Sequence, residues 1–117
     1  MSTPAGNAVP TTTVSELPDP LPADATLLDV REDDEWAAGH APGALHVPLG
    51  SLAERVGEVP RDGELYVVCH SGGRSARATA WLTQQGIEAT NVDGGMSAWA
   101  AAGRPLTADG DAEPHVG

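Results

Sequence analysis

The sequence has no lysine and no phenylalanine, and it has a single cysteine among its 117 residues. All six basic residues are arginines, against 17 acidic residues, which gives a formal net charge of −11. A chain this acidic would repel the phosphate backbone of a nucleic acid, which argues against nucleic acid as a partner. Without lysine, the chain also cannot contain the lysine-bearing glycine-rich loop that binds nucleotide phosphates.

Long apolar segments are missing as well. No window approaches the ~20 apolar residues that a membrane-spanning helix needs. Residues 1–10 have neither the cationic start nor the apolar run of a secretory signal. We therefore expect one cytoplasmic domain with no membrane partner.

The single cysteine, Cys69, limits the chemistry that the chain can hold. It excludes an intramolecular disulfide, and one thiol without further ligands at metal-binding spacing cannot build a structural zinc site. The four histidines do not cluster at such spacing either, so we expect no metal and no cofactor. Cys69 is therefore either a small buried apolar residue or a reactive group.

The hydrophobic pattern predicts alternating strands and helices. Short continuous apolar runs at residues 27–30 and 65–68 are typical of strands buried on both faces. Weaker strands are predicted at 44–47 and 89–92, and β-branched residues at 11–14 favour an edge strand. Helices are predicted over 32–38, 51–56, 75–85 and 97–102. This alternation predicts an α/β fold with a mainly parallel sheet and helices on both faces.

Three glycines and the two ends of the chain complete the organisation. Gly39, Gly86 and Gly103 each follow a helical segment, where we expect a left-handed residue to end the helix. Residues 1–8 are expected to be flexible, 9–106 to form the domain, and 107–117 to be an acidic disordered tail.

The most informative segment is residues 65–75, which predicts a buried strand, a tight glycine-containing loop and the start of a helix. Ligands bind at the carboxyl ends of strands in open α/β sheets, and a helix start directs several backbone N–H groups to one point. Gly72 and Gly73 would let the backbone close around an anion, while Arg74 and the helix dipole favour negative charge. We predict that the loop lowers the pKa of the Cys69 thiol and binds an anionic substrate through His70, Ser71, Gly72, Gly73, Arg74 and Ser75. The alternative is a buried structural cysteine, which would need neither the glycines nor the arginine.

Four motifs in order resemble the single-domain rhodaneses of the sulfurtransferase superfamily over residues 9–106. These motifs are Leu28-Asp29-Val30-Arg31 with Glu35-Trp36, then Gly39-His40-Ala41-Pro42-Gly43-Ala44, then the Cys69 loop, then Asp93-Gly94-Gly95-Met96 with Trp99. The resemblance implies a rhodanese-like, five-stranded parallel sheet flanked by helices. It also implies that Cys69 is a nucleophile that carries sulfur as a persulfide, taken from a small anionic donor such as thiosulfate. The acceptor would be cyanide, a small thiol or a cysteine of a partner protein.

The same superfamily offers alternatives, because it also contains phosphatases, arsenate reductases and non-catalytic interaction modules. Similar sulfur-handling members have a six-residue loop and phosphatases a seven-residue loop, and residues 69–74 are six. A reductase would need a second cysteine, and an interaction module would normally have lost Cys69. Many members carry arginine directly after the cysteine, whereas this chain has His70, a weaker and pH-dependent cation.

The candidates for supporting roles are Asp29, Arg31 and Arg77. Asp29 ends a core strand and is expected to be structural or to order the active loop. Arg31 and Glu35 have the spacing of a helical ion pair. Arg77 lies three residues beyond Arg74 and either adds positive potential at the mouth of the site or is a solvated surface residue.

The remaining histidines and the three tryptophans are predicted to have structural roles. We expect His40 to be a hydrogen-bonding turn residue and His46 and His115 to lie on the surface. Trp36, Trp81 and Trp99 are expected to pack the core and the helices.

Overall fold

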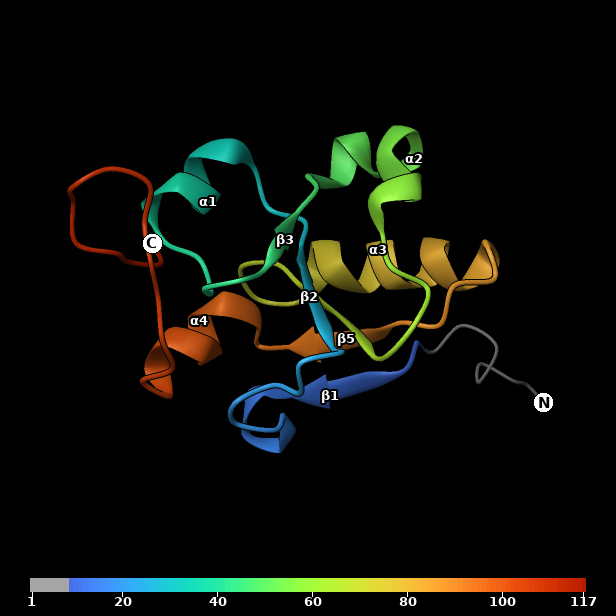
Figure 1. Cartoon of the computed structure of the whole chain (residues 1–117), viewed down its shortest axis with the longest axis horizontal. Helices are drawn as coiled ribbons and strands as arrows, with labels where there is room; N and C mark the ends of the chain where they lie inside the picture. Colours follow the sequence, from blue (N-terminus) through green and yellow to red (C-terminus); the bar gives the residue numbers. More distant parts are fainter. Residues whose placement is uncertain (1–8) are drawn as a thin grey trace.

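The computed structural model describes residues 9–117, so the predicted flexible segment 1–8 lies outside the described residues. One sheet of five strands has the order β1-β5-β4-β2-β3, and all of its pairings are parallel (Figure 1). The strands are β1 (Thr11–Thr13), β2 (Thr26–Asp29), β3 (Leu45–His46), β4 (Leu65–Val68) and β5 (Thr90–Asp93). The predicted α/β class and parallel sheet are confirmed.

Three α-helices connect successive strands: α1 (Asp33–Ala38) joins β2 to β3, α2 (Leu52–Arg55) joins β3 to β4, and α3 (Gly73–Gln84) joins β4 to β5. The fourth helix, α4 (Gly95–Ala101), follows β5. Short 3-10 turns at Leu49–Ser51 and Val56–Glu58 flank α2. Helices α3 and α4 each begin two residues before their predicted starts at 75 and 97. In both cases glycines at the end of a strand loop take up the first helical positions.

Two hydrophobic clusters cover the two faces of the sheet, which explains the continuous apolar runs. Leu28 and Val67 pack towards Leu52 and Leu82, on the side of α2 and α3. The alternate strand residues, including Val68, pack with Trp99 on the side of α4. No helix within residues 9–117 has the length and hydropathy needed to cross a bilayer.

The predicted left-handed glycines are correct at two positions and wrong at one. Gly86 and Gly103 have φ values of 82° and 74°. Gly39 has a φ of 178°, which is extended backbone, because the chain runs straight on from α1 to pair His40 with Thr107. Gly39 is required for another reason: a Cβ there would lie 2.2 Å from the carbonyl oxygen of His115.

The segment 107–117 lies along α1 instead of leaving the domain as the disordered tail we expected (Figure 1). The backbone N–H groups of Asp109 and His115 donate to the carbonyls of Ala37 and Ala38, each at 3.0 Å. The last carbonyls of a helix have no partner within that helix. The segment supplies those partners, a tertiary role that its acidic composition does not indicate.

Candidate active site

Cys69 lies directly after β4, with its side chain buried at the carboxyl edge of the sheet and a relative exposure of 1%. The backbone N–H of Gly72 donates to its Sγ at 3.1 Å, and the Ser75 hydroxyl donates at 3.4 Å. Burial raises the pKa of the Cys69 thiol, but the hydrogen bonds from Ser75, Gly72 and Ser71 outweigh burial and lower the pKa below its ordinary value. The site therefore favours a thiolate.

The start of α4 holds the loop in this conformation. Three successive loop carbonyls, those of Cys69, His70 and Ser71, accept hydrogen bonds from the N–H groups of Met96 (2.8 Å), Ser97 (2.9 Å) and Gly94 (3.0 Å). Because these carbonyls are directed at α4, the N–H groups of the loop are free to face the sulfur. The sequence reasoning assigned no role to these residues. The signal was present in the glycine pair directly after β5, at the sheet edge where Cys69 lies.

Two glycines of the site allow contacts that a side chain would prevent. Gly95 has a φ of 55°, and a Cβ there would lie 2.3 Å from the carbonyl oxygen of Cys69. Gly72 has a φ of 126°, and its Cβ would lie 3.2 Å from an Asp93 carboxylate oxygen. Close packing of the loop against β5 and α4 therefore needs glycine at both positions.

Arg74 differs from the prediction, because its guanidinium faces Glu35 and not the sulfur. Its two terminal nitrogens donate to the two Glu35 carboxylate oxygens at 2.7 and 3.0 Å. The hydrogen bond from Arg74 lowers the pKa of Glu35 to about 2, and the pair raises the pKa of Arg74. Since Glu35 compensates the charge of Arg74, hydrogen-bond donors of the loop provide most of the anion stabilisation at Cys69.

The predicted Arg31–Glu35 ion pair is not formed, because Arg31 pairs with Asp29 instead. Arg31 Nη2 lies 2.8 Å from an Asp29 carboxylate oxygen, both side chains are 1% exposed, and Arg31 also donates to the Gly39 carbonyl at 2.7 Å. Within residues 9–117, the Asp29 carboxylate accepts hydrogen bonds from Arg31 and none from the loop. A buried carboxylate such as Asp29 is costly unless a cation pairs with it. Arg31 therefore pairs with Asp29 and not with Glu35.

Trp36 stacks with two imidazole rings, those of His40 and His46, and this corrects the placement of His46 on the surface. The His46 side chain is 15% exposed, stacks on Trp36 at 4.6 Å and bonds the Arg31 carbonyl through Nε2. His40 stacks on Trp36 at 3.6 Å and bonds its carbonyl, in line with the predicted turn role. His115 is exposed. Trp99 is buried and Trp81 half-buried, as expected of packing residues.

The remaining predicted residues border the loop. His70 is half-buried, and its Nε2 bonds the carbonyl oxygen of Gly117 and not Sγ. Ser71 and Gly73 are exposed on the outer side of the loop. Arg77 is exposed one helical turn beyond Arg74. Among residues 9–117, no group of three His, Cys, Asp or Glu side chains is arranged to hold a metal ion.

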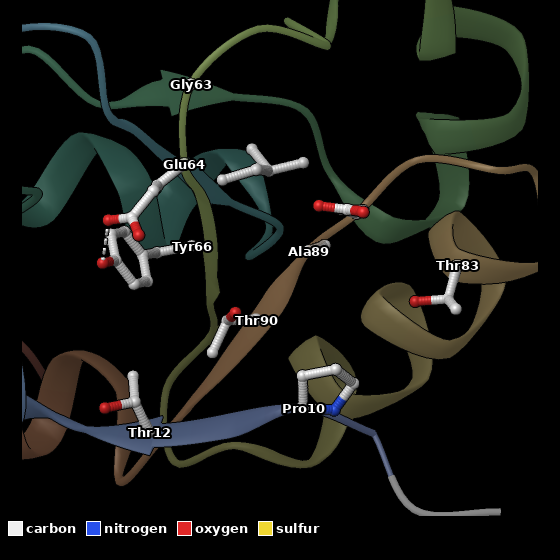
Figure 2. Close-up of a pocket in the computed structure, with 10 residues that line it drawn as sticks. Pro10, Thr12, Gly63, Glu64, Tyr66, Thr83, Ala89 and Thr90 are labelled. Atoms are coloured by element: carbon white, nitrogen blue, oxygen red, sulfur yellow. Dashed lines mark hydrogen bonds between the residues drawn. The ribbon is translucent and has the colours of Figure 1, made fainter. Parts of the chain in front are cut away.

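A cavity of about 620 Å³ lies at the amino end of β4 and β5, the end opposite to Cys69 (Figure 2). Figure 2 shows the Tyr66 hydroxyl directed at the Glu64 carboxylate, to which it donates at 2.6 Å; this bond raises the pKa of Tyr66 to about 12. The lining of this cavity contains threonines and two glutamates but no thiol or imidazole. The Cys69 thiol is at the other end of the sheet, so we assign the candidate active site to the Cys69 loop.

The sequence model of the Rhodanese-like domain matches residues 13–102. The chain belongs to the rhodanese-like family. A protein named sulfurtransferase from Allochromatium vinosum is 41% identical over 86 residues, which cover 73% of this chain and 80% of that protein. The thiosulfate sulfurtransferase GlpE of Pseudomonas putida is 38% identical over 90 residues, which cover 76% and 82% of the two chains.

The structural comparison agrees with the sequence comparison. The crystal structure of a rhodanese-related protein from Thermoplasma volcanium matches with a TM-score of 0.77 and 31% identity, over 84% of this chain and 97% of that one. The predicted rhodanese-like fold is thereby confirmed. The sulfurtransferase names support a rhodanese-type sulfurtransferase family for this domain.

Proposed function

We propose that the protein transfers sulfane sulfur from a small anionic donor such as thiosulfate to an external acceptor, with Cys69 as the carrier. The observation that carries this proposal is a buried Sγ that accepts hydrogen bonds from the Gly72 N–H and the Ser75 hydroxyl. Such fixed donors stabilise both a thiolate and the terminal anionic sulfur of a persulfide.

In the first step, the Cys69 thiolate attacks the outer sulfur of thiosulfate. A bond forms between Sγ and that sulfur while the sulfur–sulfur bond of thiosulfate breaks, and its electron pair leaves with sulfite. The product is a Cys69 persulfide anion held by the loop. No proton has to be removed by a base, which agrees with the structural contacts of His40 and the outward contact of His70.

In the second step, an acceptor thiolate or cyanide attacks the terminal sulfur and the Cys69 thiolate leaves. The product is a new persulfide or thiocyanate, and the two half-reactions predict ping-pong kinetics. None of the 117 residues is a second cysteine, so the acceptor thiol is not among them. The six-residue loop and this missing cysteine are the reasons to prefer sulfur transfer over phosphatase or arsenate reductase chemistry.

The proposal is tested by replacing Cys69 with Ala. Cyanide-dependent formation of thiocyanate from thiosulfate should fall to the uncatalysed background, while circular dichroism shows an intact fold. Thr83→Ala, near the C-terminal end of α3 and on the lining of the cavity at the opposite end of the sheet, serves as the control and should keep activity. Wild-type turnover by Cys69→Ala would contradict the assignment of the nucleophile.

A further inference from the structure

A second cavity, of about 530 Å³, lies between α2 and α3 beside the Cys69 loop. We call it the α2–α3 groove, and its lining residues are Glu32, Leu49, Gly50, Leu52, Ala53, Arg74, Arg77 and Trp81. Arg74 belongs both to the Cys69 loop and to the groove. A molecule that reaches the sulfur through the loop can therefore contact the groove at the same time.

The groove combines an apolar wall with one available positive charge. Leu52 is buried beneath it, and Leu49 and Trp81 are half-buried at its sides. Arg74 is already paired with Glu35, whereas Arg77 is exposed and makes no ion pair within residues 9–117. A free cation beside an apolar wall suits a carboxylate next to an aliphatic side chain.

Arg77 differs from the other arginines of residues 9–117 in being both unpaired and close to the Cys69 loop. Arg31 and Arg55 form ion pairs with Asp29 and Glu58, and Arg104 donates to backbone carbonyls of residues 14, 17 and 18. Arg61 is exposed like Arg77, but it precedes β4, at the amino end of the strand that leads to Cys69. On a chain of net charge −11, the groove thus holds a free cation on the helix that begins at the Cys69 loop.

The groove favours a protein acceptor over a free small thiol as the occupant, because a small thiol would use neither the apolar wall nor Arg77. Sγ is buried, so only a group presented at the loop can reach the outer sulfur. A thiol carried on a protein segment has neighbouring residues on either side, and the groove is where these would lie. Glu32, on the groove wall, would repel a carboxylate placed near it and so fix the direction of the segment.

We propose that the α2–α3 groove docks a segment of the acceptor protein in which the reactive cysteine is next to an aliphatic and an acidic residue. The aliphatic side chain packs on Leu49 and Trp81, and the carboxylate pairs with Arg77. This proposal rests on the proposed sulfur-transfer function and identifies the chemical class of its acceptor.

The test uses two synthetic peptides that each contain one cysteine and one leucine and differ only in carrying aspartates or lysines at the flanking positions. Cys69 is loaded with thiosulfate, excess donor is removed, and the single-turnover rate of sulfur discharge to each peptide is measured. Each rate is divided by the discharge rate to 2-mercaptoethanol on the same variant. At an ionic strength that screens the long-range repulsion of the acidic chain, the wild type should prefer the aspartate peptide by about three- to fivefold, the effect of one exposed ion pair. The same peptide with serine in place of leucine should react more slowly.

Arg77→Glu should reverse the preference between the two peptides, whereas Arg61→Glu, which changes the net charge equally, should keep it. An equal preference in both variants, or none in the wild type, would overturn the docking proposal while leaving sulfur transfer intact. Failure of Cys69 to load sulfur at all would overturn the proposed function and the docking proposal with it.

Discussion

Within residues 9–117, no cation forms a hydrogen bond with the Cys69 sulfur, and its two hydrogen-bond donors are neutral. The Ser75 hydroxyl and the Gly72 N–H contact Sγ, while Arg74, the nearest arginine in sequence, is turned towards Glu35. These donors stabilise a negative charge on the sulfur because the fold holds them in a fixed orientation. Mobile water molecules in their place would have to reorient around the charge.

Replacing Ser75 with Ala should raise the pKa of the Cys69 thiol, because one donor to the thiolate is lost while burial is kept. The pH dependence of alkylation by iodoacetamide measures this pKa. Ser71→Ala is the matched control, since the Ser71 side chain is exposed and only its backbone N–H acts on the sulfur. An unchanged pKa in Ser75→Ala would mean that the backbone N–H groups alone hold the thiolate.

The Glu35–Arg74 pair should contribute to stability in a defined pH range. Because pairing lowers the pKa of Glu35 from 4.5 to about 2 in the folded protein, this contribution is complete above pH 4.5 and is lost as the pH falls towards 2. Glu35→Gln should lower the free energy of unfolding in urea at pH 7 by about 1 kcal/mol. The difference between wild type and variant should disappear at the acid end of this range.

Glu58→Gln provides the control for that measurement, because it breaks the pair with Arg55, which is more exposed than the Glu35–Arg74 pair. Its effect on the free energy of unfolding should be smaller than that of Glu35→Gln. Equal effects of the two variants would show that the Glu35–Arg74 pair is no better protected from solvent than a surface pair.

At the scale of elements, two successive strand-to-helix connections build the site together. The β4–α3 connection supplies the sulfur and its donors, and the β5–α4 connection anchors the carbonyls of the first. Gly95 lies where the two meet, with a positive φ and no space for a Cβ.

Gly95→Ala should therefore cost about 1–3 kcal/mol in the free energy of unfolding, the usual cost of forcing a side chain into a strained backbone conformation. Sulfur transfer should fall even under conditions where the variant is folded, because the loop carbonyls must move. Gly57→Ala, at a position with open space and no positive φ, should leave both properties nearly unchanged. Full activity in Gly95→Ala would show that α4 does not shape the loop.

The elements themselves were largely predictable, because short apolar runs and glycine-terminated helices are local patterns. The side-chain pairing of the site was not. Arg31 had acidic residues at positions 29 and 35 within reach, and the burial of Asp29, a tertiary property, decides the choice. Glu35 and Arg74 are 39 residues apart in sequence, so no local spacing indicates their contact. The partner of the loop, at the start of α4, is likewise set by the neighbouring positions of β4 and β5 in the sheet.

At the scale of the whole molecule, an anionic donor has to approach a protein of net charge −11. Repulsion of this kind slows association and is screened by salt. The kcat/KM for thiosulfate should therefore rise between low and physiological ionic strength, whereas discharge to an uncharged thiol should change little. A kcat/KM for thiosulfate that falls with salt would show that local positive charge at the site outweighs the net charge.

Mass spectrometry of the protein after incubation with thiosulfate measures whether Cys69 carries the transferred sulfur. The peptide that contains Cys69 should gain the mass of one sulfur atom and should lose this mass after addition of cyanide. Absence of the added sulfur, or an added sulfur that cyanide does not remove, would show that Cys69 is not the carrier.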